Sequence, residues 1–203
     1  MAFPFGYSNG GNAWNAGNII DVPLDRTVEA LAALRAFPFV DQQVGMYGVS
    51  RGAEHALLLT SLMVRDKIAG VPDALAVHSP PDVICGAFDG RRWRDAGDPG
   101  WQSWDAGHRA WSWRDSTEEL LPTTTIEVER FDGPLFLSHG TADRVWSVDM
   151  TRRIVDRLHR HGKTPEIHYY EGQDHIPGSA AENEHHEHLI AFFERNLISN
   201  ERH

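Results

Sequence analysis

The chain has 203 residues, of which 41 % are hydrophobic and 24 % charged, and this composition suits one folded domain over residues 1–203. A formal net charge of −10 and the lack of a dense Lys/Arg run argue against nucleic acid or an anionic membrane as a partner. The single cysteine, Cys85, excludes an internal disulfide and a multi-thiolate metal site. Because no membrane helix or signal peptide is recognisable, we expect a cytoplasmic protein.

Strand and helix patterns alternate along most of the chain, after a Gly/Asn-rich opening of some twenty residues that reads as loop. In chain order, the predicted elements are a helix over about 24–37, a strand over 44–49, a helix over 52–64, strands over 74–77 and 134–138, a helix over 148–161, a strand over 166–170 and a helix over 184–197. This alternation predicts an α/β fold in which a parallel sheet carries helices on both faces.

Residues 82–125 interrupt the alternation with several glycines and a cluster of tryptophans. This segment is too aromatic for a linker and too irregular for one long helix, so we interpret it as an insertion that packs over the core as a cap. Its tryptophans could line an apolar substrate pocket or pack the cap itself, and both roles stay open. The candidates for substrate binding are Trp93, Trp101, Trp104 and Trp111, together with Trp146 further along the chain.

The strongest local motif is Gly48-Val49-Ser50-Arg51-Gly52, which matches Gly-x-Ser-x-Gly where a predicted strand ends and a helix begins. That context is typical of a nucleophile elbow. The glycines permit a turn sharp enough to lift the serine hydroxyl clear of the sheet, and the N-terminus of the next helix favours a developing oxyanion. The alternative is a tight turn with a capping serine.

A nucleophilic serine needs a base, and the base needs a carboxylate to orient it. Asp143 follows the predicted strand over 134–138, and His175 follows the one over 166–170. Both therefore lie at the carboxyl end of the sheet, where ligands and catalytic groups gather in open parallel sheets. The order Ser50, Asp143, His175 is also the chain order expected on such a sheet.

Other residues near these positions weigh less. Asp149 already enters a helix, and Asp174 is adjacent to His175 and would point elsewhere. His78 and His139 end strands and could support the catalytic residues, but we favour a buried hydrogen bond for each.

The run Glu184-His185-His186-Glu187-His188 has the composition of a metal cluster. On a helix, His185 and His188 could share a face, but no His-Glu-x-x-His pattern or clear third ligand accompanies them. We therefore predict no metal and interpret the run as a solvated first helical turn.

The order of Ser50, Asp143 and His175 resembles the α/β-hydrolase superfamily. More closely, residues 20–198 resemble the C-terminal catalytic domain shared by acyl-CoA thioesterases and bile acid-CoA:amino acid N-acyltransferases, near the dienelactone hydrolases. Beside the elbow, the segments that carry the resemblance are Ile20-Asp21-Val22-Pro23-Leu24, His78-Ser79-Pro80-Pro81-Asp82-Val83, Gly133-Pro134-Leu135-Phe136-Leu137, Asp143-Arg144-Val145-Trp146, Met150 and Gly172-Gln173-Asp174-His175-Ile176.

The resemblance implies a serine hydrolase that needs no cofactor. Ser50 would be the nucleophile, His175 the general base and Asp143 the residue that orients it. The expected reaction is hydrolysis of a small-molecule carboxylic ester or thioester through an acyl-serine intermediate. The alternatives are a peptidase, a dienelactone-type hydrolase, or an inactive hydrolase fold used for binding.

The same resemblance makes the backbone amide of Arg51 one oxyanion donor, and it places the second in an early loop, at Gly6 or Tyr7. The transferases of the family carry cysteine at the nucleophile position, so Ser50 favours hydrolysis. The insertion also has a basic group that would suit either the phosphates of CoA or a solvated surface: Arg91, Arg92 and Arg94.

The N-terminal side departs from the family pattern. These relatives carry an N-terminal β-sandwich, and the usual α/β-hydrolase has three or more strands before the elbow strand. At most one strand fits into residues 1–20. We therefore expect the strand over 44–49 to lie close to a sheet edge, covered by residues 1–20 or by a second subunit in a homodimer.

Overall fold

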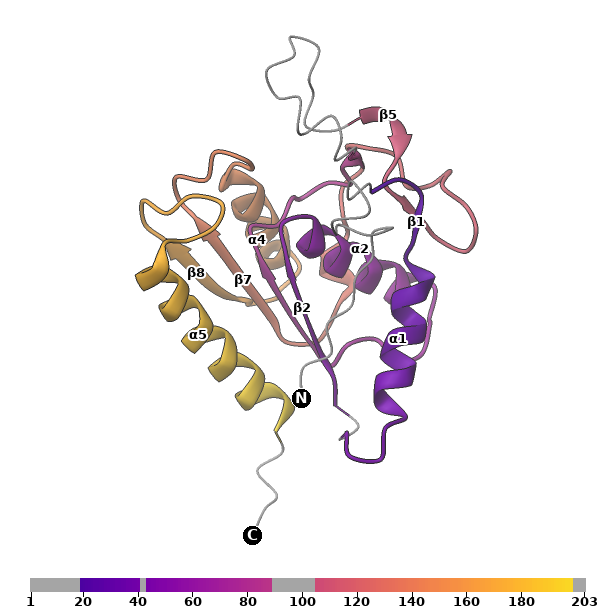
Figure 1. Ribbon diagram of the computed structural model, residues 1–203, viewed down its shortest axis with the longest axis horizontal. Coiled ribbons are helices and arrows are strands. Elements are labelled where there is room, and N and C mark those ends of the chain that lie inside the picture. Colours follow the sequence, from indigo (N-terminus) through magenta and orange to yellow (C-terminus); the bar gives the residue numbers. More distant parts are fainter. Residues whose placement is uncertain (1–18, 41–42, 89–104, 199–203) are drawn as a thin grey trace, which may run out of the picture. The chain divides into compact units, whose positions relative to one another are not determined.

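The computed structural model describes residues 19–40, 43–88 and 105–198 (Figure 1). The chain divides into two compact units. The first joins residues 1–37 to residues 83–125, and the second, here called the sheet unit, joins residues 38–82 to residues 126–203. The predicted insertion over 82–125 therefore shares a unit with the first described helix, whereas Ser50, Asp143 and His175 belong to the sheet unit.

The first unit is built from one helix and short strand pairs. The helix is α1 (Asp25–Arg35), β1 (Val22–Pro23) pairs in parallel with β6 (Trp111–Ser112), and β4 (Gly86–Ala87) pairs antiparallel with β5 (Asp105–Arg109). Trp111 and Trp113 are buried, with exposed fractions of 0 % and 2 %. Full burial favours packing of the unit over substrate contact for Trp111.

The sheet unit contains a four-stranded, wholly parallel sheet. Its strands are β2 (Gly45–Val49), β3 (Ala74–His78), β7 (Leu135–Gly140) and β8 (Glu166–Tyr170), in the spatial order β2-β3-β7-β8. Its helices are α2 (Arg51–Arg65), the short 3₁₀ helix η1 (Val128–Arg130), α4 (Asp149–Arg160) and α5 (Ser179–Leu197). The predicted parallel sheet with flanking helices is confirmed.

Helices cover both faces of this sheet. Ala74, Ala76 and Phe136 point to one face and pack against Phe192 of α5, which runs along the strands in Figure 1. The β2–β3 and β7–β8 connections cross the sheet in the same direction, and parallel crossovers are right-handed, so α2 and α4 share the other face. A sheet buried on both faces explains why its strands read as short apolar runs.

Helix α5 begins at Ser179, five residues before the predicted start at residue 184. Ala180 and Ala181 are strong helix formers and extend the helix on the N-terminal side of the acidic and histidine-rich run. His185 therefore lies in the second turn. The interpretation of this run as a solvated first turn is wrong for His185, whose exposed fraction is 3 %.

Strand β2 lies at an edge of the sheet that the structure describes, as expected. The expected cover, residues 1–20, falls almost wholly outside the described residues. In the described part of the chain, no helix combines the length and apolarity needed to span a bilayer.

Candidate active site

Ser50 occupies the turn between β2 and α2 with a backbone conformation of φ 56° and ψ −121°. A positive φ is rare for a residue with a side chain and marks a strained turn. Gly48 permits the turn, because a Cβ atom there would lie 2.1 Å from the carbonyl oxygen of Gly52. The strand–turn–helix context of the Gly-x-Ser-x-Gly motif is thus present, and its first glycine is required by close backbone approach.

The elbow is fixed by backbone hydrogen bonds on both sides of Ser50. The Ser50 amide donates to the carbonyl of His78 on the adjacent strand, at 3.0 Å. The Ser50 carbonyl accepts the amides of Ala53 and Glu54, which closes the first turn of α2. Arg51 is the first residue of that helix, and its guanidinium pairs with Glu54 at 3.0 Å. Arg51 could therefore serve an oxyanion through its backbone amide and not through its charge.

Asp143 and His175 lie side by side at the carboxyl ends of β7 and β8. The distance from His175 Nδ1 to Asp143 Oδ2 is 2.7 Å. The Asp143 side chain is fully buried, and 13 % of the His175 side chain is exposed. Because an ionised carboxylate only accepts hydrogen bonds, Nδ1 carries the proton and Nε2 keeps its lone pair.

Four donors converge on the Asp143 carboxylate. Oδ1 accepts the amides of Val145 and Trp146 at 2.8 and 2.9 Å, while Oδ2 accepts His175 and also Nε2 of His139 at 3.0 Å. Burial of Asp143 opposes ionisation. The hydrogen bonds from the two histidines and the two amides outweigh burial and hold the pKa of Asp143 well below its usual range.

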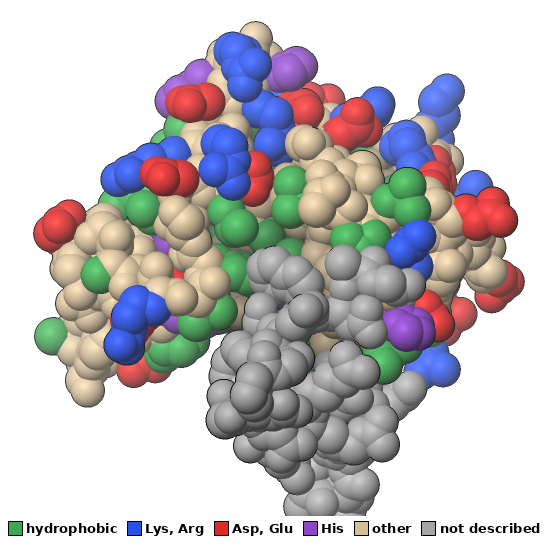
Figure 2. Space-filling view, turned by 90° about the horizontal axis from the view of Figure 1, so that it is seen from above, with side chains coloured by type: hydrophobic (Ala, Val, Ile, Leu, Met, Phe, Trp, Pro, Cys, Tyr) green, Lys and Arg blue, Asp and Glu red, His purple; other side chains and the backbone are tan. Residues whose placement is uncertain are grey.

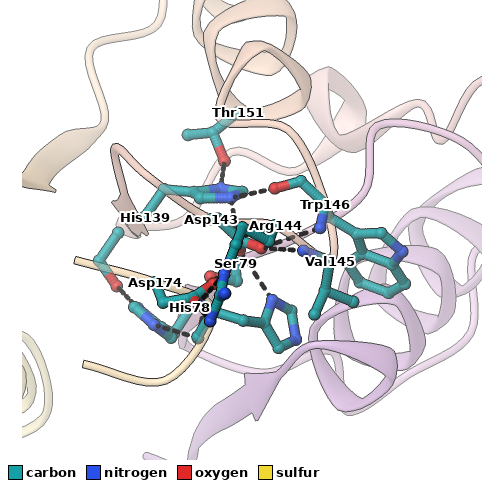
Figure 3. A network of polar contacts seen from close by, with 11 residues as sticks. His78, Ser79, His139, Asp143, Arg144, Val145, Trp146, Thr151 and Asp174 are labelled. Carbon is teal, nitrogen blue, oxygen red and sulfur yellow. Dashed lines mark hydrogen bonds and ion pairs between the residues drawn. The ribbon is translucent and has the colours of Figure 1, made fainter. Parts of the chain in front are cut away.

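His139 is fully buried and has one tautomer that satisfies all its neighbours. Nε2 lies near two acceptors, Asp143 Oδ2 and the Trp146 carbonyl, so it carries the proton. Nδ1 then accepts the hydroxyl of Thr151 on α4, at 2.7 Å (Figure 3). The predicted buried hydrogen bond is confirmed, but sequence reasoning missed that the partner is Asp143. The signal in the sequence was a histidine near the end of a strand, four residues before the acid.

The loop that carries His175 is tied to the end of β3. The His175 carbonyl accepts His78 Nε2 at 3.2 Å and the Ser79 hydroxyl at 3.5 Å. His78 Nδ1 in turn accepts the Ser138 hydroxyl, and burial lowers the pKa of His78 to about 3, so this histidine is neutral. Among the described contacts, Ser50 and His175 are joined through His78 and not by a direct hydrogen bond.

Apolar side chains flank the Asp143–His175 pair. Trp146 is buried and meets the His175 ring edge-on, with centroids 5.8 Å apart. Val145 directly precedes this tryptophan and Ile176 directly follows the base, and both side chains are more than half exposed. Figure 2 shows acidic and basic side chains interspersed around hydrophobic ones on the face it views.

The competing carboxylates have other partners. Asp149 binds Arg152 one turn further along α4, at 2.8 Å. Asp174 accepts the amide of Arg144 and pairs with its guanidinium. Both therefore point away from the imidazole of His175, as expected for Asp174.

The histidine-rich run of α5 serves hydrogen bonding. His185 Nε2 lies 2.8 Å from the hydroxyl of Tyr47, and the Tyr170 hydroxyl lies near Nδ1 of both His185 and His188. Across the described residues, no group of three or more His, Cys, Asp or Glu side chains is placed to hold a metal ion.

Several predicted site residues lie outside the described residues. They are the oxyanion candidates Gly6 and Tyr7, the pocket candidates Trp93, Trp101 and Trp104, and the basic residues Arg91, Arg92 and Arg94.

A family model described as the prolyl oligopeptidase family matches residues 69–200, more than half of the chain. The chain belongs to the prolyl oligopeptidase family. The matched span includes Asp143 and His175, and Ser50 precedes it.

Relatives and solved structures agree with this assignment at the level of the fold. The chain is 27 % identical over 168 residues to acyl-coenzyme A thioesterase 6 of Mus musculus, covering 75 % of this chain and 37 % of that protein. It thus spans little more than a third of the curated relative. It matches Porphyromonas gingivalis dipeptidyl peptidase 4 with a TM-score of 0.60 at 16 % identity, over 86 % of this chain and 22 % of that one. It also matches MGS-M1, an α/β-hydrolase from a Medee basin deep-sea metagenome library, with a TM-score of 0.55 at 14 % identity, over 84 % of this chain and 63 % of that one. The predicted α/β-hydrolase fold and resemblance are confirmed.

Proposed function

We propose that this α/β-hydrolase cleaves a carboxylic ester or thioester through an acyl-Ser50 intermediate, with His175 as the general base and Asp143 as its orienting acid. The observation that carries the proposal is the 2.7 Å contact between His175 Nδ1 and a buried Asp143 whose carboxylate has four donors. Such a pair fixes the imidazole tautomer and leaves Nε2 as the base.

The chemistry follows from that tautomer. Nε2 of His175 takes the proton of the Ser50 hydroxyl as Oγ bonds to the substrate carbonyl carbon. The tetrahedral intermediate collapses as the bond to the leaving oxygen or sulfur breaks, and the imidazolium returns its proton to that atom. Water then hydrolyses the acyl-serine with His175 again as base, and Asp143 stays ionised throughout because its pKa is low.

The negative oxygen of the intermediate needs donors near Ser50. The Arg51 amide at the start of α2 is the proposed first donor, since it lies next to the nucleophile and at the positive end of the helix. The second remains a prediction at Gly6 or Tyr7. Loss of one such donor typically costs about 10²–10³ in rate.

Two substrate classes have specific support. The thioesterase relative and the apolar residues beside His175 favour an acyl substrate. Membership in the prolyl oligopeptidase family favours a peptidase as the second candidate, since peptide bonds yield to the same machinery. A homodimer and a cytoplasmic setting stay predictions.

The decisive experiment is intact-mass analysis after exposure to a fluorophosphonate, with Ser50→Ala as control. A single adduct that is lost in the variant supports the nucleophile assignment, and no adduct on folded wild-type protein would overturn it. Turnover of p-nitrophenyl esters, acyl-CoA thioesters and proline-containing peptide anilides then separates the two classes. We expect turnover of the esters and thioesters and little of the anilides.

A further inference from the structure

The loops after β7 and β8 are locked together by their backbones. The Thr141 amide donates to the Tyr170 carbonyl at 3.0 Å, and the Ala142 amide donates to the Gln173 carbonyl at 2.9 Å. In return, the Gly172 amide donates to the Thr141 hydroxyl at 2.8 Å. One loop continues to Asp143 and the other to His175, so these bonds bring acid and base into the same region.

The approach of the two loops is unusually close. A Cβ atom on Gly140 would lie 2.4 Å from the Gln173 carbonyl oxygen and 2.5 Å from that of Asp174. Only glycine fits there, and the loop with the base therefore rests on the backbone of the loop with the acid.

The carboxylate of Asp174 connects the two loops beyond this close approach. Oδ1 of Asp174 accepts the amide of His175 at 2.8 Å and the amide of Arg144 at 3.0 Å. Oδ2 accepts Nε of Arg144 at 2.6 Å, and the same guanidinium contacts it again through Nη2 (Figure 3). The two amides belong to the residue after Asp143 and to the base itself.

We propose that Asp174 is a positioning residue for the reaction, because its Oδ1 atom bridges the backbone beside the acid to the backbone of the base and so sets the Asp143–His175 contact. The proposal rests on the proposed function of Ser50, Asp143 and His175. Asp174 acts only through these residues and touches no reacting atom.

The two amide bonds, and not the ion pair, carry this role. The Arg144 side chain is 86 % exposed, and exposed ion pairs contribute little because water screens them. Hydrogen bonds from backbone amides to a carboxylate are charge-assisted and directional. The amide of Arg144, followed by its guanidinium and the amide of His175, lowers the pKa of Asp174 to about 2, so the carboxylate is ionised at working pH.

Four variants separate the contributions. Asp174→Ala removes both acceptors, whereas Asp174→Asn keeps an amide oxygen at the Oδ1 position. Asp174→Glu keeps the charge but moves the carboxylate away from both amides, and Arg144→Ala removes the ion pair but leaves its amide. Asp132→Ala is the matched control, because Asp132 pairs with Lys163 on the surface of the sheet unit and is 94 % exposed.

We expect Asp174→Ala and Asp174→Glu to lower kcat about 10- to 100-fold with little change in KM, as slight misplacement of catalytic groups does. Asp174→Asn and Arg144→Ala should stay within about threefold of the wild type, as Asp132→Ala should. The result specific to this proposal is that Asp174→Glu, which keeps the charge, lowers kcat more than Asp174→Asn, which removes it. If Asp174→Ala does not fold, the contrast between Asp174→Glu and Asp174→Asn carries the test.

The low-field proton NMR signal of His175 Nδ1–H supplies a second readout that a loss of stability alone does not move. It should be lost in Asp174→Glu and kept in Asp174→Asn, both measured well below their melting temperatures. The proposal is overturned if Asp174→Glu matches Asp132→Ala, or if Asp174→Asn or Arg144→Ala is as impaired as Asp174→Glu. If the wild type shows no Ser50 labelling, the proposed function fails separately, and the NMR signal still tests the bridge.

Discussion

His139 donates Nε2–H to Oδ2 of Asp143, the same carboxylate oxygen that accepts the hydrogen bond from Nδ1–H of the base. The acid is therefore held between a fully buried histidine and the largely buried base, and its second oxygen accepts two backbone amides. Such a carboxylate cannot rotate without breaking at least two hydrogen bonds. Its orientation is set by β7, which carries His139 as its next-to-last residue and leads directly into the acid loop.

The first prediction concerns the acid itself. Asp143→Asn should leave the fold intact and lower the rate of Ser50 acylation by about 10⁴, because an amide at this position favours the wrong imidazole tautomer. The rate of fluorophosphonate labelling measures the effect directly. Asp149→Asn, which alters an exposed pair with Arg152, should label at the wild-type rate. Equal rates for the two variants would remove Asp143 from the proposed triad.

The second prediction separates the contribution of His139 to stability from its contribution as a hydrogen-bond donor to Asp143. Substitution by Ala removes one of the four donors to Asp143 and takes away the His139 partner of the Thr151 hydroxyl and of the Trp146 carbonyl. Each buried group left unsatisfied should cost about 1–3 kcal/mol of unfolding free energy. Substitution by Gln restores a donor near the Nε2 position. We expect urea titration to show a large loss of stability for Ala and a smaller loss for Gln.

The rate of fluorophosphonate labelling should follow the same order as the stability, with His139→Ala slower than His139→Gln. Slow labelling in His139→Ala that Gln partly recovers indicates that the donor to Asp143 matters, whereas unchanged labelling in folded His139→Ala would limit His139 to a stabilising role.

The sheet was predictable because its strands are short apolar runs and its helices have apolar residues at helical spacing. Each predicted boundary lies within a few residues of the observed one, except at the start of α5. The elbow was predictable for a stronger reason. At position 48 a side chain would clash with the backbone of Gly52, so the turn requires a glycine there, and Gly48 is visible in the sequence. The loop positions of Asp143 and His175 followed from the rule that strand ends in a parallel sheet share one edge.

The support around the site was harder to predict, because it depends on contacts between residues far apart in the chain. His78 touches the His175 carbonyl across 97 positions, and Asp174 reaches Arg144 across 30. Nothing in the sequence near Asp174 distinguishes a bridging carboxylate from a solvated one. The prediction for His185 was wrong for a related reason, because a histidine in a charged helical segment is expected to be exposed. In the structure, Tyr47 and Tyr170 pack against His185 and form hydrogen bonds with its ring.

The third prediction is a loss of stability in mild acid. Burial, followed by the neighbouring histidines, lowers the pKa of His185 to about 4, whereas an unfolded histidine titrates near 6.5. Between these values the unfolded chain binds a proton that the folded chain does not. Stability is therefore full above about pH 6.5, falls as the pH drops towards 4, and loses nothing further from this group below that.

Urea unfolding between pH 8 and pH 4 measures this dependence. His185→Gln should flatten the curve by up to about 3 kcal/mol, since a pKa lowered from 6.5 to about 4 corresponds to a free energy of this order. His161→Gln is the matched control, because His161 is exposed beyond α4, and its curve should parallel that of the wild type. A His185→Gln curve as steep as the control's would contradict the assignment.

The fourth prediction concerns the elbow. Gly48→Ala places a methyl group 2.1 Å from a backbone oxygen that cannot move without opening the first turn of α2. We expect a loss of about 1–3 kcal/mol in unfolding free energy together with loss of labelling, as overpacking against backbone does. Gly178→Ala, where the nearest atom is the side-chain oxygen of Gln173 at 3.5 Å, should change neither.

The last prediction addresses the acyl group. Val145 and Ile176 expose 51 % and 61 % of their surface beside the acid and the base, where they could cover an aliphatic chain attached to the scissile carbonyl. Burial of a methylene contributes about 0.8 kcal/mol, so replacing both by Ser should lower kcat/KM for an octanoyl ester about tenfold. The acetyl ester, which is too short to reach these side chains, should be little affected. Ile190→Ser is the matched control, because Ile190 is 57 % exposed on α5. A parallel loss for both esters would show that the two side chains support the loops and do not select the acyl chain.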